Sequence, residues 1–141
     1  MAIMPTHAVV WIDHHEARIF HVDHAAAEES TVLAPQHHIH RHPKGRGEAR
    51  EHPDDAHRFF TEVARALDGV DATLLVGPAS AKLEFFRHLH DHERRIGATV
   101  VGIETVDHPT DGEIVARARV AFKTSDQMGL TGANVGGGLR S

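Results

Sequence analysis

The sequence contains no cysteine among its 141 residues. This absence excludes disulfide frameworks, thiolate zinc sites, iron–sulfur clusters and cysteine nucleophiles, and it is compatible with a reducing compartment. The sequence also lacks an apolar run of the roughly 18 residues that a membrane-spanning helix needs. Its first residues lack the basic and apolar regions of a secretory signal. We therefore expect a cytoplasmic protein that does not associate with a membrane.

Positive charge is scarce overall but concentrated in one segment. The formal net charge of -5 argues against a globally basic nucleic-acid-binding protein. Residues 37–50, however, contain only one acidic side chain, Glu48, against four basic ones, Arg41, Lys44, Arg46 and Arg50. The fifteen histidines would add positive charge as the pH falls toward their ordinary pKa of about 6.5. Local charge is therefore a better guide to a binding surface than net charge.

The length of the chain corresponds to a single ordinary domain, which we place at residues 1–124. The last segment, residues 125–141, contains five glycines and few residues that could form a core. This composition predicts a flexible C-terminal tail.

Three N-terminal segments have the composition of β-strands. Residues 7–13 are apolar nearly throughout, which is typical of a strand buried on both faces. Residues 16–23 form the second expected strand, and the two residues between these segments allow only an antiparallel hairpin. The third strand is expected at residues 31–40, where Pro35 marks a bend, an edge position or the end of the strand.

Helices and strands alternate in the rest of the chain. Pro53 opens a helix whose predicted buried stripe comprises Ala56, Phe59, Phe60, Val63 and Leu67. A short buried strand at residues 72–76 is followed by a second helix, with its inner face predicted at Leu83, Phe86 and Leu89. A strand at residues 98–106 precedes a third helix, which begins with a capping box formed by Thr110 and Glu113.

The resulting element order, βββαβαβα, predicts an α/β fold. An antiparallel meander would be extended by two strands that helical crossovers make parallel to the first strand. The expected architecture is a ribonuclease H-like, five-stranded mixed sheet with helices packed on it. A fold alone does not give function, so each candidate site needs its own argument.

Asp13 is the one acidic residue placed where a ribonuclease H-type nuclease would need a metal ligand. Such nucleases need several carboxylates around two divalent ions, and the strand at residues 72–76 ends in Gly77-Pro78 without an acid. A turn aspartate that accepts hydrogen bonds from nearby backbone amides explains Asp13 more simply. Neither Asp13-His14-His15 nor Glu104 with Asp107-His108 accompanies a recognisable nucleophile. We therefore expect a protein that is not an enzyme and has no catalytic residue.

The histidines of residues 37–42 could bind zinc, nickel or copper. His38, His40 and His42 would lie on one side of a strand, and neutral imidazole is a good ligand for these ions. No neighbouring acceptor group that would fix their geometry is evident in the sequence. The alternative is a solvated edge whose imidazoles help to contact phosphate. We expect no resident cofactor.

The basic segment is the main candidate for a binding site. Arg41, Lys44, Arg46 and Arg50 on a glycine-containing loop could neutralise phosphates of a folded RNA without reading its sequence. The loop contains no aromatic residue for base stacking, which favours structured RNA or a ribosomal surface over single-stranded RNA. The alternative is a solvated loop without a binding role.

Three features of the sequence resemble a known family. They are the basic glycine loop Lys44-Gly45-Arg46-Gly47-Glu48, the helix that opens at Pro53, and the segment Leu74-Leu75-Val76-Gly77-Pro78-Ala79-Ser80-Ala81-Lys82. In order and spacing they are similar to the middle domain of the eukaryotic and archaeal class-I peptide-chain release factors and Pelota, together with short bacterial relatives. The resemblance covers about residues 7–124. It implies a ribosome-associated or RNA-docking module.

The resemblance does not imply peptide release. The family's Gly-Gly-Gln motif, which assists hydrolysis of peptidyl-tRNA, is absent from this sequence, and Glu48 occupies the nearest matching position. A carboxylate cannot donate the hydrogen bond that a glutamine amide can donate.

Three hypotheses of different classes follow. The first is a non-enzymatic ribosome- or RNA-binding protein of the translation machinery, which contacts phosphate through the basic loop. The second is a divalent-metal-binding protein or metal-dependent hydrolase that uses the histidine-rich segment. The third is a homodimer that forms through the third, histidine-rich strand, if that edge is left unpaired.

Overall fold

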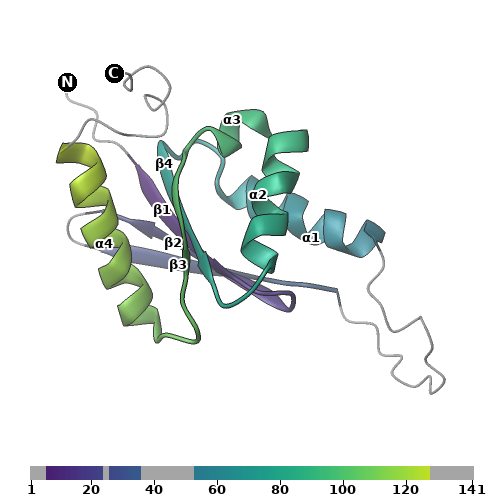
Figure 1. The fold of residues 1–141 in the computed structure, drawn as a ribbon, viewed down its shortest axis with the longest axis horizontal. Coiled ribbons are helices and arrows are strands. Elements are labelled where there is room, and N and C mark those ends of the chain that lie inside the picture. The colour runs from purple at the N-terminus through teal and green to yellow at the C-terminus, as the bar shows by residue number, and fades with distance from the viewer. Residues whose placement is uncertain (1–5, 24–25, 36–52, 128–141) are drawn as a thin grey trace.

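A computed structural model describes residues 6–23, 26–35 and 53–127, which form a mixed β-sheet with helices on both faces (Figure 1). The sheet has five strands in the order β3-β2-β1-β4-β5. Helices α1 (Pro53–Ala66) and α2 (Ala81–His92) cover one face, and α4 (Asp111–Gln127) covers the other. The predicted α/β class and five-stranded mixed sheet are confirmed.

Strand directions follow from the lengths of the connections. β1 (His7–Ile12) pairs antiparallel with β2 (Glu16–Val22), and β2 pairs antiparallel with β3 (Ala27–Leu33). β4 (Ala72–Gly77) is parallel to β1, and β5 (Val100–Thr105) is parallel to β4. Short hairpins permit only antiparallel neighbours, whereas the two parallel pairs are joined through helices.

The two central strands divide the core into two halves. Successive side chains of a strand point to opposite faces of the sheet. Val10 and Ile12 of β1 therefore pack against α1 and α2, while Val9 and Trp11 pack against α4. Because both faces are covered, β1 is apolar at consecutive positions instead of alternating with polar residues.

Helix α1 presents most of its predicted stripe to the core. Phe59, Phe60, Val63 and Leu67 are buried, and Ala56 is half-buried. The capping box at the start of α4 is also confirmed, because the Thr110 amide donates to the Glu113 carboxylate (2.8 Å) and the Glu113 amide donates to the Thr110 hydroxyl (3.2 Å). These local sequence signals specified both helices correctly.

The third strand lies earlier than predicted. It spans Ala27–Leu33 instead of residues 31–40, because the turn after β2 closes at once: the Asp23 amide donates to the Ala26 carbonyl oxygen (2.9 Å). β3 lies at the edge of the sheet, and its side chains are almost all exposed. Because the side chains of this edge strand are exposed, apolar and polar residues do not alternate along it. The sequence pattern therefore did not predict that its first four residues, Ala-Glu-Glu-Ser, form a strand. The edge is therefore acidic, and the prediction that the strand itself is histidine-rich is wrong.

The inner face of α2 agrees with the prediction only in part. Leu89 is buried and Phe86 is half-buried against the core, but Leu83 is 55% exposed. The other buried residues of this helix are Ala81, Lys82, Phe85 and His88. Lys82 tolerates burial because its ammonium group donates to the Ala79 carbonyl oxygen (2.6 Å) while its methylene chain covers apolar surface. A short helix, α3 (Arg94–Gly97), follows and was not predicted.

The C-terminal helix reaches Gln127, and the rest of the predicted tail lies outside the described residues. The proposed boundary between a domain at residues 1–124 and a tail at residues 125–141 stays a prediction. No helix in the described part of the chain is long and apolar enough to span a membrane.

Candidate functional site

The residues predicted to contact phosphate or metal lie outside the described residues. Arg41, Lys44, Arg46 and Arg50, like His38, His40 and His42, belong to residues 36–52. The described chain reaches residue 35 just after β3 and resumes at Pro53, the first residue of α1. The roles of these seven side chains therefore stay predictions.

Asp13 has the turn role predicted for it. Its Oδ1 atom accepts hydrogen bonds from the amides of His15 (2.8 Å) and Glu16 (2.9 Å), which close the hairpin between β1 and β2. Within the described ranges, no group of three potential metal ligands includes Asp13 or any other carboxylate. The described residues thus give no support to a ribonuclease H-type metal centre.

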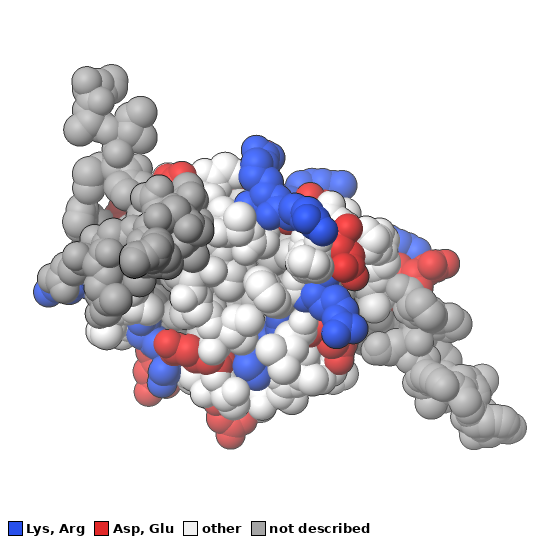
Figure 2. All heavy atoms as spheres, turned by 45° about the horizontal axis from the view of Figure 1, so that its top comes forward, with Lys and Arg blue, Asp and Glu red and all other residues white. Residues whose placement is uncertain are grey.

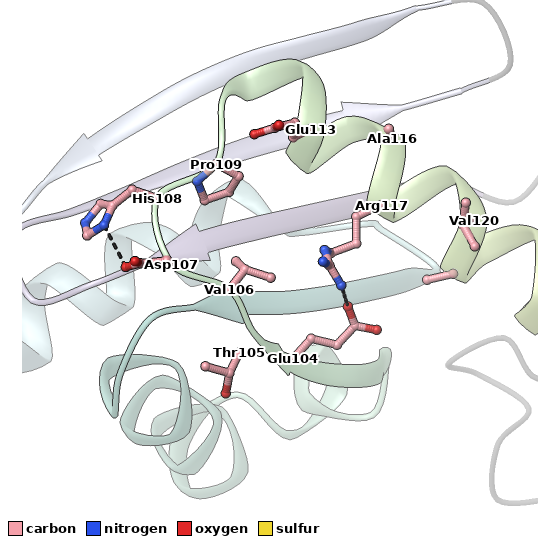
Figure 3. A pocket seen from close by; sticks show the side chains of 11 residues that line it. Glu104, Thr105, Val106, Asp107, His108, Pro109, Glu113, Ala116, Arg117 and Val120 are labelled. Atoms are coloured by element: carbon pink, nitrogen blue, oxygen red, sulfur yellow. Dashed lines mark hydrogen bonds and ion pairs between the residues drawn. The ribbon is translucent and has the colours of Figure 1, made fainter.

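A groove of about 770 Å³ lies between the end of β5 and helix α4 (Figure 3). Its wall on one side is the segment of residues 104–109, and on the other it is one face of α4. Charged or titratable side chains from both sides line it, namely Glu104, Asp107, His108, Glu113 and Arg117. The sequence analysis noted Glu104, Asp107 and His108, and the structure brings all three into this groove.

The polar side chains in the groove have partners within it or beside it. Arg117 Nη1 lies 2.9 Å from Glu104 Oε1, and His108 Nδ1 lies 2.9 Å from Asp107 Oδ1. Glu113 accepts the hydrogen bond of the capping box. The only hydroxyl group in the lining belongs to Thr105.

A small network around Trp11 joins the sheet to α4. The Arg18 guanidinium lies 4.7 Å from the centre of the Trp11 ring, a cation–π arrangement. Arg18 Nη1 also lies 2.7 Å from Asp111 Oδ1, at the first residue of α4. Arg18 of β2 therefore connects Trp11 of β1 to the start of α4.

Comparison with known proteins gives a likeness in structure but none in sequence. No protein-family model matches the chain, and no protein with a curated description matches it at a significant level. The solved structures that resemble it include Pelota proteins and an archaeal translation termination factor. Pelota from Archaeoglobus fulgidus superposes with a TM-score of 0.56 and 17% identity, over 88% of this chain and 38% of that one.

Two further structures agree. Pelota from Thermoplasma acidophilum gives a TM-score of 0.53 at 19% identity, over 88% of this chain and 39% of that one. An archaeal translation termination factor, aRF1, gives 0.54 at 14% identity, over 94% of this chain and 42% of that one. The chain shares the fold of one segment of these factors. It spans about two fifths of their length.

One cluster of potential metal ligands was not predicted from the sequence. His57 of α1 lies beside His88 and His92 of α2, and one ring nitrogen of each is within 4.8 Å of those of the others. The spacing of four residues between His88 and His92 was a visible signal, because it places both on one face of a helix. The contribution of His57 depends on how α1 packs against α2, which no local pattern gives.

Proposed function

We propose that this protein is a translation-associated module that docks on the ribosome or on structured RNA and catalyses no reaction itself. The observation that supports it is the fold shared with Pelota and aRF1 over 88–94% of the chain. The aRF1 structure is described as a translation termination factor.

A finer assignment to the middle-domain family is part of this proposal. The meander of β1, β2 and β3, extended by β4 and β5 parallel to β1, is the arrangement expected of a ribonuclease H-like domain. One of the sequence features that resemble the family, Leu74–Lys82, covers the end of β4, the glycine turn and the start of α2.

Docking would use the basic loop between β3 and α1. Arg41, Lys44, Arg46 and Arg50 offer four positive charges that can neutralise phosphates without base-specific contacts. Because the Gly-Gly-Gln motif is absent and Glu48 stands at the nearest position, the proposed role is attachment rather than peptide release.

Cosedimentation with purified ribosomes tests the proposal. The wild-type protein and a variant with Arg41, Lys44, Arg46 and Arg50 replaced by alanine are compared from about 50 mM to about 500 mM salt. A matched control removes the same number of charges from exposed positions in the helices, by replacing Arg58, Arg87, Arg94 and Arg95 with alanine. Figure 2 shows that lysine and arginine side chains are present on the described surface, so this control is needed.

The expected result is salt-sensitive binding that the loop variant loses and the control variant retains. Equal loss in both variants would show attraction by charge alone and would refute docking through the loop. A wild-type protein that stays in the supernatant at low salt would refute ribosome docking. Binding would then be measured with structured RNA alone. Binding to that RNA would support docking on RNA outside the ribosome, and its absence would refute the proposal.

A further inference from the structure

Three histidines from two helices converge on one point beside the core. His57 lies one turn into α1, and His88 and His92 lie one turn apart on α2. The ring centres are 5.0 Å apart for His57 and His88, 5.0 Å for His57 and His92, and 4.9 Å for His88 and His92. The three ring centres therefore form an almost equilateral triangle.

This triangle is close to the size that a tetrahedral metal ion needs. With zinc about 2.0–2.1 Å from each nitrogen, the ligand nitrogens lie about 3.3–3.4 Å apart and the ring centres about 5 Å apart. The ring centres already have that spacing, and the nitrogens are within 4.8 Å of one another. His57 and His92 are exposed and can rotate to bring their nitrogens closer, whereas His88 is fixed by packing.

His88 is the member of the cluster whose position needs an explanation. It is only 7% exposed and packs against Phe60 and Phe85, with ring-centre distances of 5.6 Å and 6.5 Å. Its Nε2 atom is buried and has no hydrogen-bond partner among the residues that the structure describes. An unpaired buried polar atom is costly, so it calls for a ligand or another compensating group.

The surroundings of His88 favour the form of imidazole that binds metal. Burial, followed by the nearby His57 and His92, lowers the pKa of His88, which keeps the ring neutral near pH 7. A metal ion requires this neutral form. The carboxylates of Glu93 and Asp91 act on His88 in the opposite direction and would attract a cation.

We propose that His57, His88 and His92 form a binding site for a divalent transition-metal ion of the borderline class, with Zn²⁺ as its best representative. Imidazole ligands suit zinc, nickel, copper and cobalt, whereas magnesium and calcium prefer oxygen ligands. Three protein ligands leave one tetrahedral position for water or another small ligand. The site differs from the histidine-rich segment at residues 37–42, and it does not depend on the proposed role in translation.

The ion would join α1 to α2. Each of these helices packs on the same face of the sheet, and α1 begins directly after residues 36–52. A ligand that binds the folded chain through residues of both helices stabilises the folded state. Zinc binding should therefore raise the melting temperature as well as occupy the site.

The test uses the untagged full chain and Zn²⁺ as the probe. The histidine-rich segment would compete for zinc, so the reference protein carries glutamine at His37, His38, His40 and His42. Isothermal titration gives stoichiometry and affinity, Co²⁺ absorption reports coordination geometry, and thermal unfolding with and without Zn²⁺ reports stabilisation. His57→Gln and His92→Gln remove one exposed ligand each, and His90→Gln removes an exposed histidine of α2 outside the cluster.

The reference protein and His90→Gln should each bind one Zn²⁺ per chain and melt at a higher temperature with zinc. His57→Gln and His92→Gln should each bind at least about tenfold more weakly and lose the rise in melting temperature. Because His57 and His92 are exposed, these variants should fold even if a change at buried His88 does not. The proposal is wrong if the reference protein binds no stoichiometric zinc, or if both variants bind as tightly as His90→Gln.

Discussion

Trp11 donates a hydrogen bond from its indole Nε1 to the backbone carbonyl oxygen of Asp107 (3.1 Å), a residue 96 positions further along the chain. Trp11 is only 1% exposed, and its ring lies in the half of the core beneath α4. The bond therefore ties the middle of the sheet to the segment that forms one wall of the groove beside α4. Buried indole groups normally have such a partner.

Replacing Trp11 with phenylalanine should lower the free energy of unfolding by about 2–3 kcal/mol. The variant loses buried volume and leaves the Asp107 carbonyl oxygen without its donor. Urea unfolding measures the change. Asp107→Ala is the matched control, because it keeps the backbone acceptor and alters an exposed side chain, so it should cost less than about 1 kcal/mol. Equal losses in the two variants would contradict this account of the hydrogen bond.

Gly77 should not tolerate a side chain. It ends β4 beside β1, and a Cβ atom there would overlap the carbonyl oxygen of Ile12. Both strands are buried, so the backbone has little room to move, and Gly77→Ala should destabilise the protein by about 1–3 kcal/mol or more.

Gly112 provides the matched control for that substitution. A Cβ atom at this position in the first turn of α4 would meet no atom within 4 Å. Gly112→Ala should therefore leave stability unchanged or raise it by up to about 1 kcal/mol, because alanine favours the helix. Thermal unfolding of both variants checks the pair, and a harmless Gly77→Ala would show that β1 and β4 are less closely held than described.

The metal-free protein should lose stability as the pH falls below about 6.5, the ordinary pKa of histidine. Burial lowers the pKa of His88 in the folded chain, with His57 and His92 acting in the same direction and Glu93 and Asp91 opposing them. Between the ordinary pKa and the lower folded value, the unfolded chain binds more protons. The free energy of unfolding then rises with pH in this window, and the contribution of His88 is complete above it.

Urea unfolding in the presence of a chelator, from about pH 7.5 to about pH 5, measures this dependence. His88→Gln should reduce the loss of stability on acidification, whereas His90→Gln, a change at an exposed position, should not. An unchanged pH dependence in His88→Gln would show that other groups cause it.

Ribosome binding should strengthen as the pH falls from about 8 to about 6, if the histidines beside the basic loop assist phosphate contact. Glutamine at His37, His38, His40 and His42 should abolish this gain while leaving the arginine-dependent binding at the higher pH. The cosedimentation assay at constant salt measures the effect. Affinity that does not change with pH would remove the histidines from the docking surface but leave the arginines and Lys44 in place.

The sequence determined most of the fold because its strongest signals are local. Three local signals each specify an element without reference to distant residues. They are the nearly continuous apolar run of residues 7–13, the stripe containing Phe59, Phe60 and Val63, and the capping box of Thr110 and Glu113. The chain order of these elements then restricts the sheet to few topologies. The turn role of Asp13 followed from the same kind of local argument.

Only the tertiary structure placed β3 and the inner face of α2. β3 is an exposed edge strand paired through its backbone, so its side chains carry almost no pattern. The buried positions of α2 include Lys82 and His88, which composition alone would assign to the surface. A buried polar side chain depends on partners supplied by other elements, and the sequence does not show which elements will meet.

The same reason separates the two classes of candidate site. The charges of Arg41, Lys44, Arg46 and Arg50 lie close together in the chain, so the sequence alone nominated them. His57 is far from His88 and His92 in the chain, and the three rings meet only because α1 and α2 pack side by side on one face of the sheet. Local composition is enough to nominate the first candidate site, whereas the second candidate becomes visible only when the two helices are packed together.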